Sequence, residues 1–170
     1  DEYPDGDRYV HGELAIYDPE NGERQGEVVL PAEELGAACV DSQGSIGAIG
    51  FATTAGESYA DSWINDDPTL FLVSSDLGTI DVLPLAIEPW QELGFKAIAA
   101  LGAGDFVVAG KRGDNALIFR VLADGTLLWL REFGEAGPAD IFNDLVVLDT
   151  GEILAIGTTA SYGYVEHSLW

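Results

Sequence analysis

The sequence predicts an all-β fold built from repeated four-stranded antiparallel meanders, and three observations lead to this prediction. Four short apolar runs of about strand length cover residues 96–101, 106–110, 116–122 and 127–133. Turn motifs separate these runs, and Asp124-Gly125 is a strong hairpin signal because glycine adopts the positive φ that such turns need. The run at 116–122 is apolar at both alternating sets of positions, so both faces of its sheet require cover. The rest of the chain repeats the pattern and supplies that cover.

Two series of glycines mark the repeat. The first series consists of pairs spaced six residues apart, namely Gly44/Gly50, Gly104/Gly110 and Gly151/Gly157. The second consists of the hairpin-turn glycines Gly22, Gly78 and Gly125. Successive copies are offset by 60 and 47 residues in the first series and by 56 and 47 in the second. Self-similarity near this spacing is typical of propeller blades and other repeat arrays. We therefore expect the first glycine of each pair to lie in an equivalent turn with positive φ, and the second to end an equivalent inner strand.

The repeat divides a single β-propeller region, residues 1–170, into four parts. If the strands of one unit are called a to d, residues 1–30 give a c-d hairpin and residues 139–170 give strands a-b-c of a truncated unit. Residues 31–88 and 89–138 each give a full unit. The total of about three to three and a half blades is below the four or more of closed propellers. We expect an incomplete propeller, either a fragment of a longer polypeptide or one that a second chain completes.

Two connectors between units and one insertion interrupt the strands. Residues 31–36 and 89–94 both begin with Pro and end with Gly, which predicts a single helical turn in each. Residues 51–68 form an insertion between the second and third strands of one unit, where the other full unit needs only residues 111–115. Insertions in repeat proteins usually lie on one face, and this is often the binding face.

The insertion carries the candidate partner-binding residues. These are Tyr59, Asp61, Trp63 and Asn65. Aromatic side chains beside carboxylates in a loop are suited to bind a protein or a polysaccharide. The alternative is that Trp63 folds back and covers the adjacent blade.

Acidic residues give weak calcium candidates at two places, Asp5 with Asp7 and Asp66 with Asp67. A hard cation needs several carboxylate or carbonyl oxygens, and neither place fits the twelve-residue calcium loop. Plain solvation is the alternative, and no other cofactor is expected. The two histidines are isolated and the sequence holds no Cys-x-x-Cys, which argues against zinc. No nucleophile-elbow pattern is present, so no catalytic residue is assigned and an enzyme is not expected.

The charge balance limits the classes of partner. Lys and Arg number 7 against 30 Asp and Glu, for a net charge of −23. Phosphates would be repelled over most of this surface, which argues against nucleic acid and anionic membrane surfaces. No apolar run approaches the roughly 20 residues that span a bilayer, so no membrane insertion is expected. The single cysteine, Cys39, excludes an internal disulfide and is predicted to be a small buried hydrophobe.

Two passages resemble the β-propeller repeats of bacterial exported and cell-surface proteins, of the seven-bladed type. They are Phe133-Gly134 followed by NDLVVLDTGEILAIGTT at 143–159, and FRVLADGTLLW at 119–129. In that family an aromatic-Gly pair closes a blade, a D-x-x-G run ending in G-T-T forms the inner strands, and a D-G turn followed by Trp forms the outer hairpin. The match is good over 95–160 and loose over 10–90, where Leu30-Pro31 replaces the aromatic-Gly pair.

The resemblance implies a propeller that is commonly extracellular or periplasmic, and it carries over no catalytic residue. The leading hypothesis is a non-catalytic interaction and assembly scaffold of a bacterial cell-envelope or extracellular protein. A glycan-binding or glycan-cleaving propeller is the alternative, and it would bring carboxylates together near the central channel. The acids here are spread over turns, which favours the scaffold. A quinoprotein-like electron-transfer propeller is a second alternative, based on the turn at 18–22.

Overall fold

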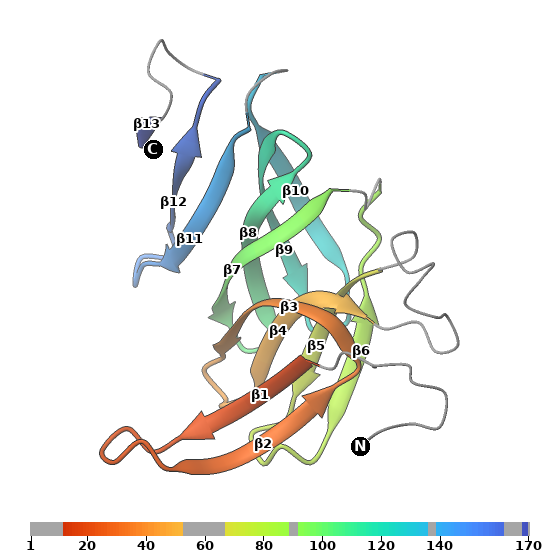
Figure 1. The fold of residues 1–170 in the computed structure, drawn as a ribbon, viewed down its shortest axis with the longest axis vertical. Helices are drawn as coiled ribbons and strands as arrows, with labels where there is room; N and C mark the ends of the chain where they lie inside the picture. The colour runs from red at the N-terminus through yellow and green to blue at the C-terminus, as the bar shows by residue number, and fades with distance from the viewer. Residues whose placement is uncertain (1–11, 53–66, 89–91, 136–138, 162–167, 170) are drawn as a thin grey trace, which may run out of the picture.

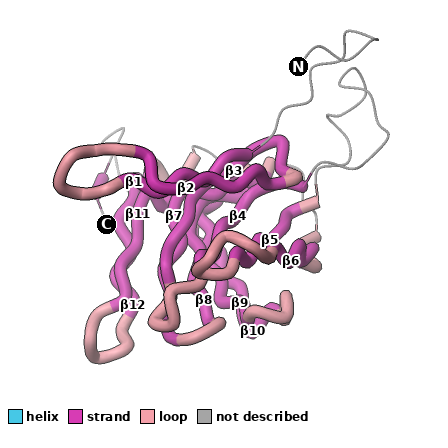
Figure 2. Tube along the Cα trace, turned by 90° about the horizontal axis from the view of Figure 1, so that it is seen from below, coloured by secondary structure: helices cyan, strands magenta, loops and turns pink. Residues whose placement is uncertain are grey.

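Figure 1 shows a computed structural model of the chain, which describes residues 12–52, 67–88, 92–135, 139–161 and 168–169. These residues form thirteen strands and no helix, and every strand pair is antiparallel. Figure 2 shows the described residues from below as strands and connecting loops. The predicted all-β fold class is therefore confirmed.

The strands form four sheets that follow one another in chain order (Figure 1). The first is a hairpin of β1 (Gly12–Tyr17) and β2 (Arg24–Leu30). The second is a four-stranded meander of β3 (Ala32–Val40), β4 (Ile46–Ala52), β5 (Pro68–Val73) and β6 (Ile80–Pro84). The third repeats this meander with β7 (Leu93–Gly102), β8 (Asp105–Arg112), β9 (Asn115–Leu122) and β10 (Leu127–Phe133). The fourth contains β11 (Ile141–Val147), β12 (Ile153–Thr159) and β13 (Ser168–Leu169).

The sheets pack face to face because their strands are apolar on both sides. Along β8, Phe106 and Val108 point into the core shared with the sheet β3–β6, whereas Val107 and Ala109 point into the core shared with β11–β13. All four side chains are fully buried. A third core lies between β1–β2 and β3–β6, where Leu30 is fully buried. The double-sided pattern predicted from the sequence is thus a stack of sheets with a separate apolar layer in each interface.

An equivalent bulge in the first strand of each of the last three sheets explains the second glycine of every pair. Gly50, Gly110 and Gly157 each pair with the inner-strand residue that directly precedes a shift in register. A Cβ at Gly110 would lie 2.0 Å from the carbonyl oxygen of Gly94, and a Cβ at Gly157 would lie 2.0 Å from that of Ile141. The close approach of two backbones requires glycine here, whatever its φ.

The first glycine of each pair lies in a turn, as predicted. The φ angles are 87° at Gly44, 65° at Gly104 and 83° at Gly151, all in the left-handed region that favours glycine. The hairpin-turn series holds only in part. Gly78 is not in this region, and Leu77 adopts a φ of 60° in its place.

The predicted helical turn at residues 31–36 is wrong. Strand β3 already begins at Ala32, which is fully buried and pairs with Ala52 of β4. The backbone hydrogen bonds of this segment therefore go to the sheet. The predicted turn at 89–94 is wrong at its end, because Leu93 pairs with Arg112 in strand β7 and Gly94 follows in the same strand. Residues 89–91 lie outside the described residues.

No helix long and apolar enough to cross a membrane occurs in the described part of the chain.

Candidate functional site

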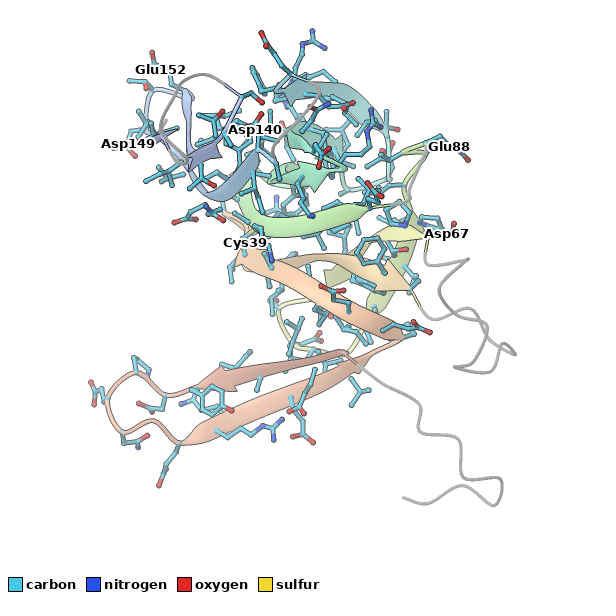
Figure 3. All side chains as sticks on the ribbon, turned by 45° about the horizontal axis from the view of Figure 1, so that its top comes forward. Cys39, Asp67, Glu88, Asp140, Asp149 and Glu152 are labelled. Atoms are coloured by element: carbon cyan, nitrogen blue, oxygen red, sulfur yellow. The ribbon has the colours of Figure 1, made fainter. Side chains whose placement is uncertain are left out.

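Most of the residues that the sequence nominated lie outside the described ranges. This applies to the partner-binding candidates Tyr59, Asp61, Trp63 and Asn65 and to the calcium candidates Asp5, Asp7 and Asp66. Asp67 is described and exposed, directly before β5 (Figure 3). Its carbonyl oxygen accepts hydrogen bonds from the Ala52 amide at 3.2 Å and the Thr69 hydroxyl at 2.8 Å. Among the described residues, no three His, Cys, Asp or Glu side chains gather where they could hold a metal ion.

A cavity of about 390 Å³ lies between the sheets β3–β6 and β7–β10. Turns from both sheets line it, and they contribute Asp41, Gln43 and Ser45 from one side and Ala103, Gly104 and Ala123 from the other. The strands add Leu72, Asp81 and the fully buried ring of Phe106. A cavity of this size with an apolar wall and a few polar groups is typical of small-ligand sites.

Asp41 connects the two sheets at this cavity. Its side chain is only 9% exposed. Oδ1 accepts hydrogen bonds from the backbone amides of Gln43 at 2.8 Å and Ser45 at 2.9 Å, both in its own turn. Oδ2 accepts one from the Gly104 amide at 3.2 Å, 63 residues along the chain. The carboxylate thus fixes the turn between β3 and β4 against the turn between β7 and β8.

The cavity is anionic. Burial of Asp41 acts to raise its pKa, but the hydrogen bonds from the backbone amides of Gln43, Gly104 and Ser45 outweigh it, so the pKa lies below its usual range. Asp41 is therefore ionised at neutral pH. Asp81 supplies a second, exposed carboxylate, and none of the described residues that line the cavity is basic.

Cys39 lies near this site on β3 (Figure 3). The side chain packs against the core between β3–β6 and β7–β10, as expected of a small hydrophobe, but it is half-buried and not buried as predicted. Burial and, to a smaller extent, the charge of Asp41 raise the pKa of its thiol to about 11. The thiol is therefore neutral and poorly nucleophilic at physiological pH.

A second buried carboxylate, Asp140, joins strands within the last sheet (Figure 3). The residue is fully buried, directly before β11. Its Oδ1 accepts a hydrogen bond from the Ala160 amide at 2.8 Å, its Oδ2 accepts one from the Ser161 hydroxyl, and its own amide donates to the Asp114 carbonyl at 2.7 Å. The first two bonds hold the end of β12 beside the start of β11, and the third attaches Asp140 to the turn between β8 and β9 in the preceding sheet. Asp140 is therefore a structural residue.

One face of the strands β11 and β12 carries four exposed apolar side chains, with the exposed Asp144 beside them, opposite Ile156. Val146, Leu148, Leu154 and Ile156 are 48%, 43%, 59% and 49% exposed. Val146 pairs with Leu154, so their side chains lie side by side on one face. The opposite face carries Phe142 and Leu145, which are buried against β7–β10. The sequence showed that these strands are apolar, but only the packing shows which face is covered.

The architecture decides the fold type. The last three sheets are antiparallel meanders, the first strand of each carries the same bulge, and these strands, β3, β7 and β11, are neighbours across successive interfaces. The sheets are β-propeller blades. No family model matches the chain, and no curated protein matches it. Among solved structures, the chain is similar to one described as "Structure of Dos1 propeller", with a TM-score of 0.48 and 12% sequence identity over 87% of this chain. The match covers 36% of that chain.

Sequence reasoning missed both carboxylates of the cavity. A signal for Asp41 exists in the repeat itself. Asp41 lies three residues before Gly44, and the positions three residues before Gly104 and Gly151 are Leu101 and Leu148. A charged residue at a position where the other copies have leucine departs from what packing alone requires. Asp81 gave no such signal, because its role depends on which sheet faces β6.

Proposed function

We propose that this chain is a non-catalytic interaction and assembly scaffold of a bacterial cell-envelope or extracellular protein. The observation that carries the proposal is the apolar face of β11–β12 formed by Val146, Leu148, Leu154 and Ile156, called here the open face. The resemblance of residues 119–159 to the repeats of bacterial exported and cell-surface propellers supports the setting. Isolated exposed hydrophobic residues are ordinary, but a contiguous apolar group marks an interaction surface.

The other sheets indicate what covers the open face. Gly157 is equivalent to Gly110, so Leu154 and Ile156 correspond to Val107 and Ala109 of β8. Those two residues are fully buried, and the sheet β11–β13 covers them. The same face of the preceding unit is therefore closed by another β-sheet. We propose that a β-sheet also closes the open face, and that in a solution of this chain alone the sheet is the open face of a second copy.

The expected affinity follows from the buried area. Complete burial of a Val, Leu or Ile side chain contributes about 1.5–3 kcal/mol, so a half-exposed one gains about 1 kcal/mol. Eight such side chains, four from each copy, contribute about 8 kcal/mol. Association itself costs at least about 4 kcal/mol. The remaining 4 kcal/mol or so corresponds to a dissociation constant of about 1 mM.

The test is sedimentation equilibrium of the chain at protein concentrations up to about 1 mM. We expect concentration-dependent association that strengthens with added salt, because salt screens the repulsion between copies of charge −23. Leu154→Lys should abolish the association. Val82→Lys is the matched control, since Val82 is 41% exposed on β6, away from the open face. A chain that remains a monodisperse monomer over this range would refute the proposal.

A further inference from the structure

The cavity between β3–β6 and β7–β10 has the chemistry of a site for an organic cation. We propose that it binds an alkylammonium or guanidinium group at the end of an aliphatic chain, through the carboxylates of Asp41 and Asp81. The inference is independent of the open face, which lies on a different sheet.

The first step concerns the acceptor capacity of Asp41. A carboxylate offers about four acceptor positions over its two oxygens. Oδ1 uses two of them for the amides of Gln43 and Ser45, while Oδ2 accepts one hydrogen bond, from Gly104, among the described residues. The Gly44 amide also lowers the pKa of this carboxyl, so Oδ2, with one direct hydrogen bond, is the oxygen that we assign to a donor inside the cavity. Because the carboxylate is held from both sheets, its position is fixed before any ligand binds.

The second step concerns charge. Asp81 adds a carboxylate to the same cavity, and no described lining residue carries a positive charge that would neutralise the pair. The whole chain has 30 acidic residues against 7 basic ones, so the surrounding field has the same sign. Charged walls around a partly enclosed, low-dielectric space raise the local concentration of counter-ions. A cationic group is therefore attracted to the cavity before any specific contact forms.

The third step separates an organic cation from a metal ion. Calcium takes six to eight oxygen ligands, supplied by carboxylates, carbonyls and waters. The cavity instead combines its carboxylates with an apolar wall that includes Leu72, Ala123 and the ring of Phe106. Apolar walls contribute nothing to a hydrated metal ion, but they bury the methylene groups of a lysine-like or arginine-like chain. An aromatic ring also attracts ammonium and guanidinium groups.

The shared chemistry has two sources, a Lys or Arg side chain of a protein partner and a free small amine. The probes that distinguish them are N-acetyl-lysine methylamide, N-acetyl-arginine methylamide and 1,4-diaminobutane, with N-acetyl-norleucine methylamide as the neutral analogue. Binding is measured by saturation-transfer NMR, which observes the probe and works whether or not the chain associates. Tighter binding of the capped amino acids indicates a protein side chain as the source, and tighter binding of the diamine indicates a free amine.

The variants connect the binding to the cavity. Asp81→Asn removes an exposed carboxylate and should weaken the cationic probes about three- to fivefold, the range of a partly solvated ion pair. Asp149→Asn removes an equal charge from the exposed turn between β11 and β12 and should leave the affinity unchanged. Asp41→Asn should abolish binding, with circular dichroism checking that the blades remain folded. Asp81→Asn keeps the test valid if Asp41→Asn unfolds.

Three results with the organic probes would overturn the proposal. The first is that no cationic probe shows saturable binding up to about 50 mM in 150 mM salt, where surface attraction is screened. The second is that the norleucine analogue binds as tightly as the cationic probes. The third is that Asp81→Asn and Asp149→Asn weaken the binding of the cationic probes equally. Saturable binding of calcium that Asp81→Asn weakens would also overturn it, since the site would then be a metal site.

Discussion

Replacement of Gly110 by alanine tests whether the repeated glycines are required by contact between backbones. The added Cβ would lie 2.0 Å from the carbonyl oxygen of Gly94, whereas real Cβ atoms essentially never approach other atoms within 3.0 Å. Strands β7 and β8 must therefore separate locally by at least about 1 Å. Phe95, which pairs with Gly110, lies in this segment and is only 3% exposed.

The cost can be worked out from what this separation breaks. One or two strand hydrogen bonds weaken, at about 0.5–1.5 kcal/mol each. The displaced Phe95 ring stacks on Phe51 with ring centroids 5.1 Å apart and contacts Phe119 edge-on at 6.0 Å. Overpacking of this kind costs about 1–3 kcal/mol. The sum predicts a loss of about 3 kcal/mol in the free energy of unfolding, or a fall of about 6–12 °C in the melting temperature.

Urea unfolding followed by circular dichroism measures this difference, and two other glycines provide the controls. Gly151→Ala places a Cβ in open space at a φ of 83°, so only the backbone strain of about 1 kcal/mol is expected. Gly102→Ala has neither a neighbour within 4 Å nor a positive φ, and it should change stability by less than about 0.5 kcal/mol. If the free energies of unfolding of Gly110→Ala and Gly102→Ala differ by less than about 0.5 kcal/mol, the close approach of β7 and β8 does not constrain position 110.

Two further predictions concern acid stability and the insertion. Burial acts to raise the pKa of Asp140, but hydrogen bonds from Ser161, Thr159 and the Ala160 amide outweigh it and lower the pKa below the ordinary 3.8. The stabilisation by Asp140 is therefore complete above about pH 4 and is lost as the pH falls through the lower folded pKa. The urea midpoint of Asp140→Asn should be lower than that of the unchanged protein at pH 7, and it should change less with pH below pH 4. Parallel curves of midpoint against pH for the two proteins would contradict this. The bounds predicted for the insertion, 51–68, are wrong at both ends, because Phe51 and Pro68 pair with each other in strands β4 and β5. Replacement of residues 53–66 by a turn as short as residues 111–115 should therefore leave the circular dichroism spectrum unchanged and weaken protein binding. Loss of the β spectrum would contradict this prediction.

The fold could be predicted from the sequence because two local requirements recur at a fixed spacing. Gly104 and Gly151 are needed for the turn, and Gly110 and Gly157 for the bulge, so chemistry local to one hairpin identifies each unit. The prediction was wrong at residues 31–36, where local Pro and Gly signals favoured a helical turn. Pairing of the segment with β4, which lies beyond the reach of a local signal, decided the structure there.

The candidate site was less predictable than the fold for a physical reason. The cavity exists only where two sheets meet, and Asp41 and Gly104 come together from positions 63 residues apart. No spacing in the sequence encodes that contact. The turn at Leu77 shows the same limit on a smaller scale. Gly78 is adjacent and was the obvious residue for a positive φ, yet Leu77 adopts it, with its side chain against the core between β1–β2 and β3–β6.

The alternation along β8 has a consequence for how the protein loses its structure. Phe106 and Val108 belong to one apolar layer, and Val107 and Ala109 belong to the next. Each hydrophobic core therefore lies between two blades and not within one. Unfolding of one blade exposes the apolar faces of both of its neighbours. The free energy of opening each blade therefore depends on whether the adjacent blades are folded, as in a row of coupled units. The end sheets, which have one neighbour each among the described residues, should exchange their amide hydrogens first, and β8 and β9 last. A destabilising substitution in β8 would thus weaken the packing of the sheets on both sides of it, whereas one in β12 would weaken the packing against β7–β10 alone among the described sheets.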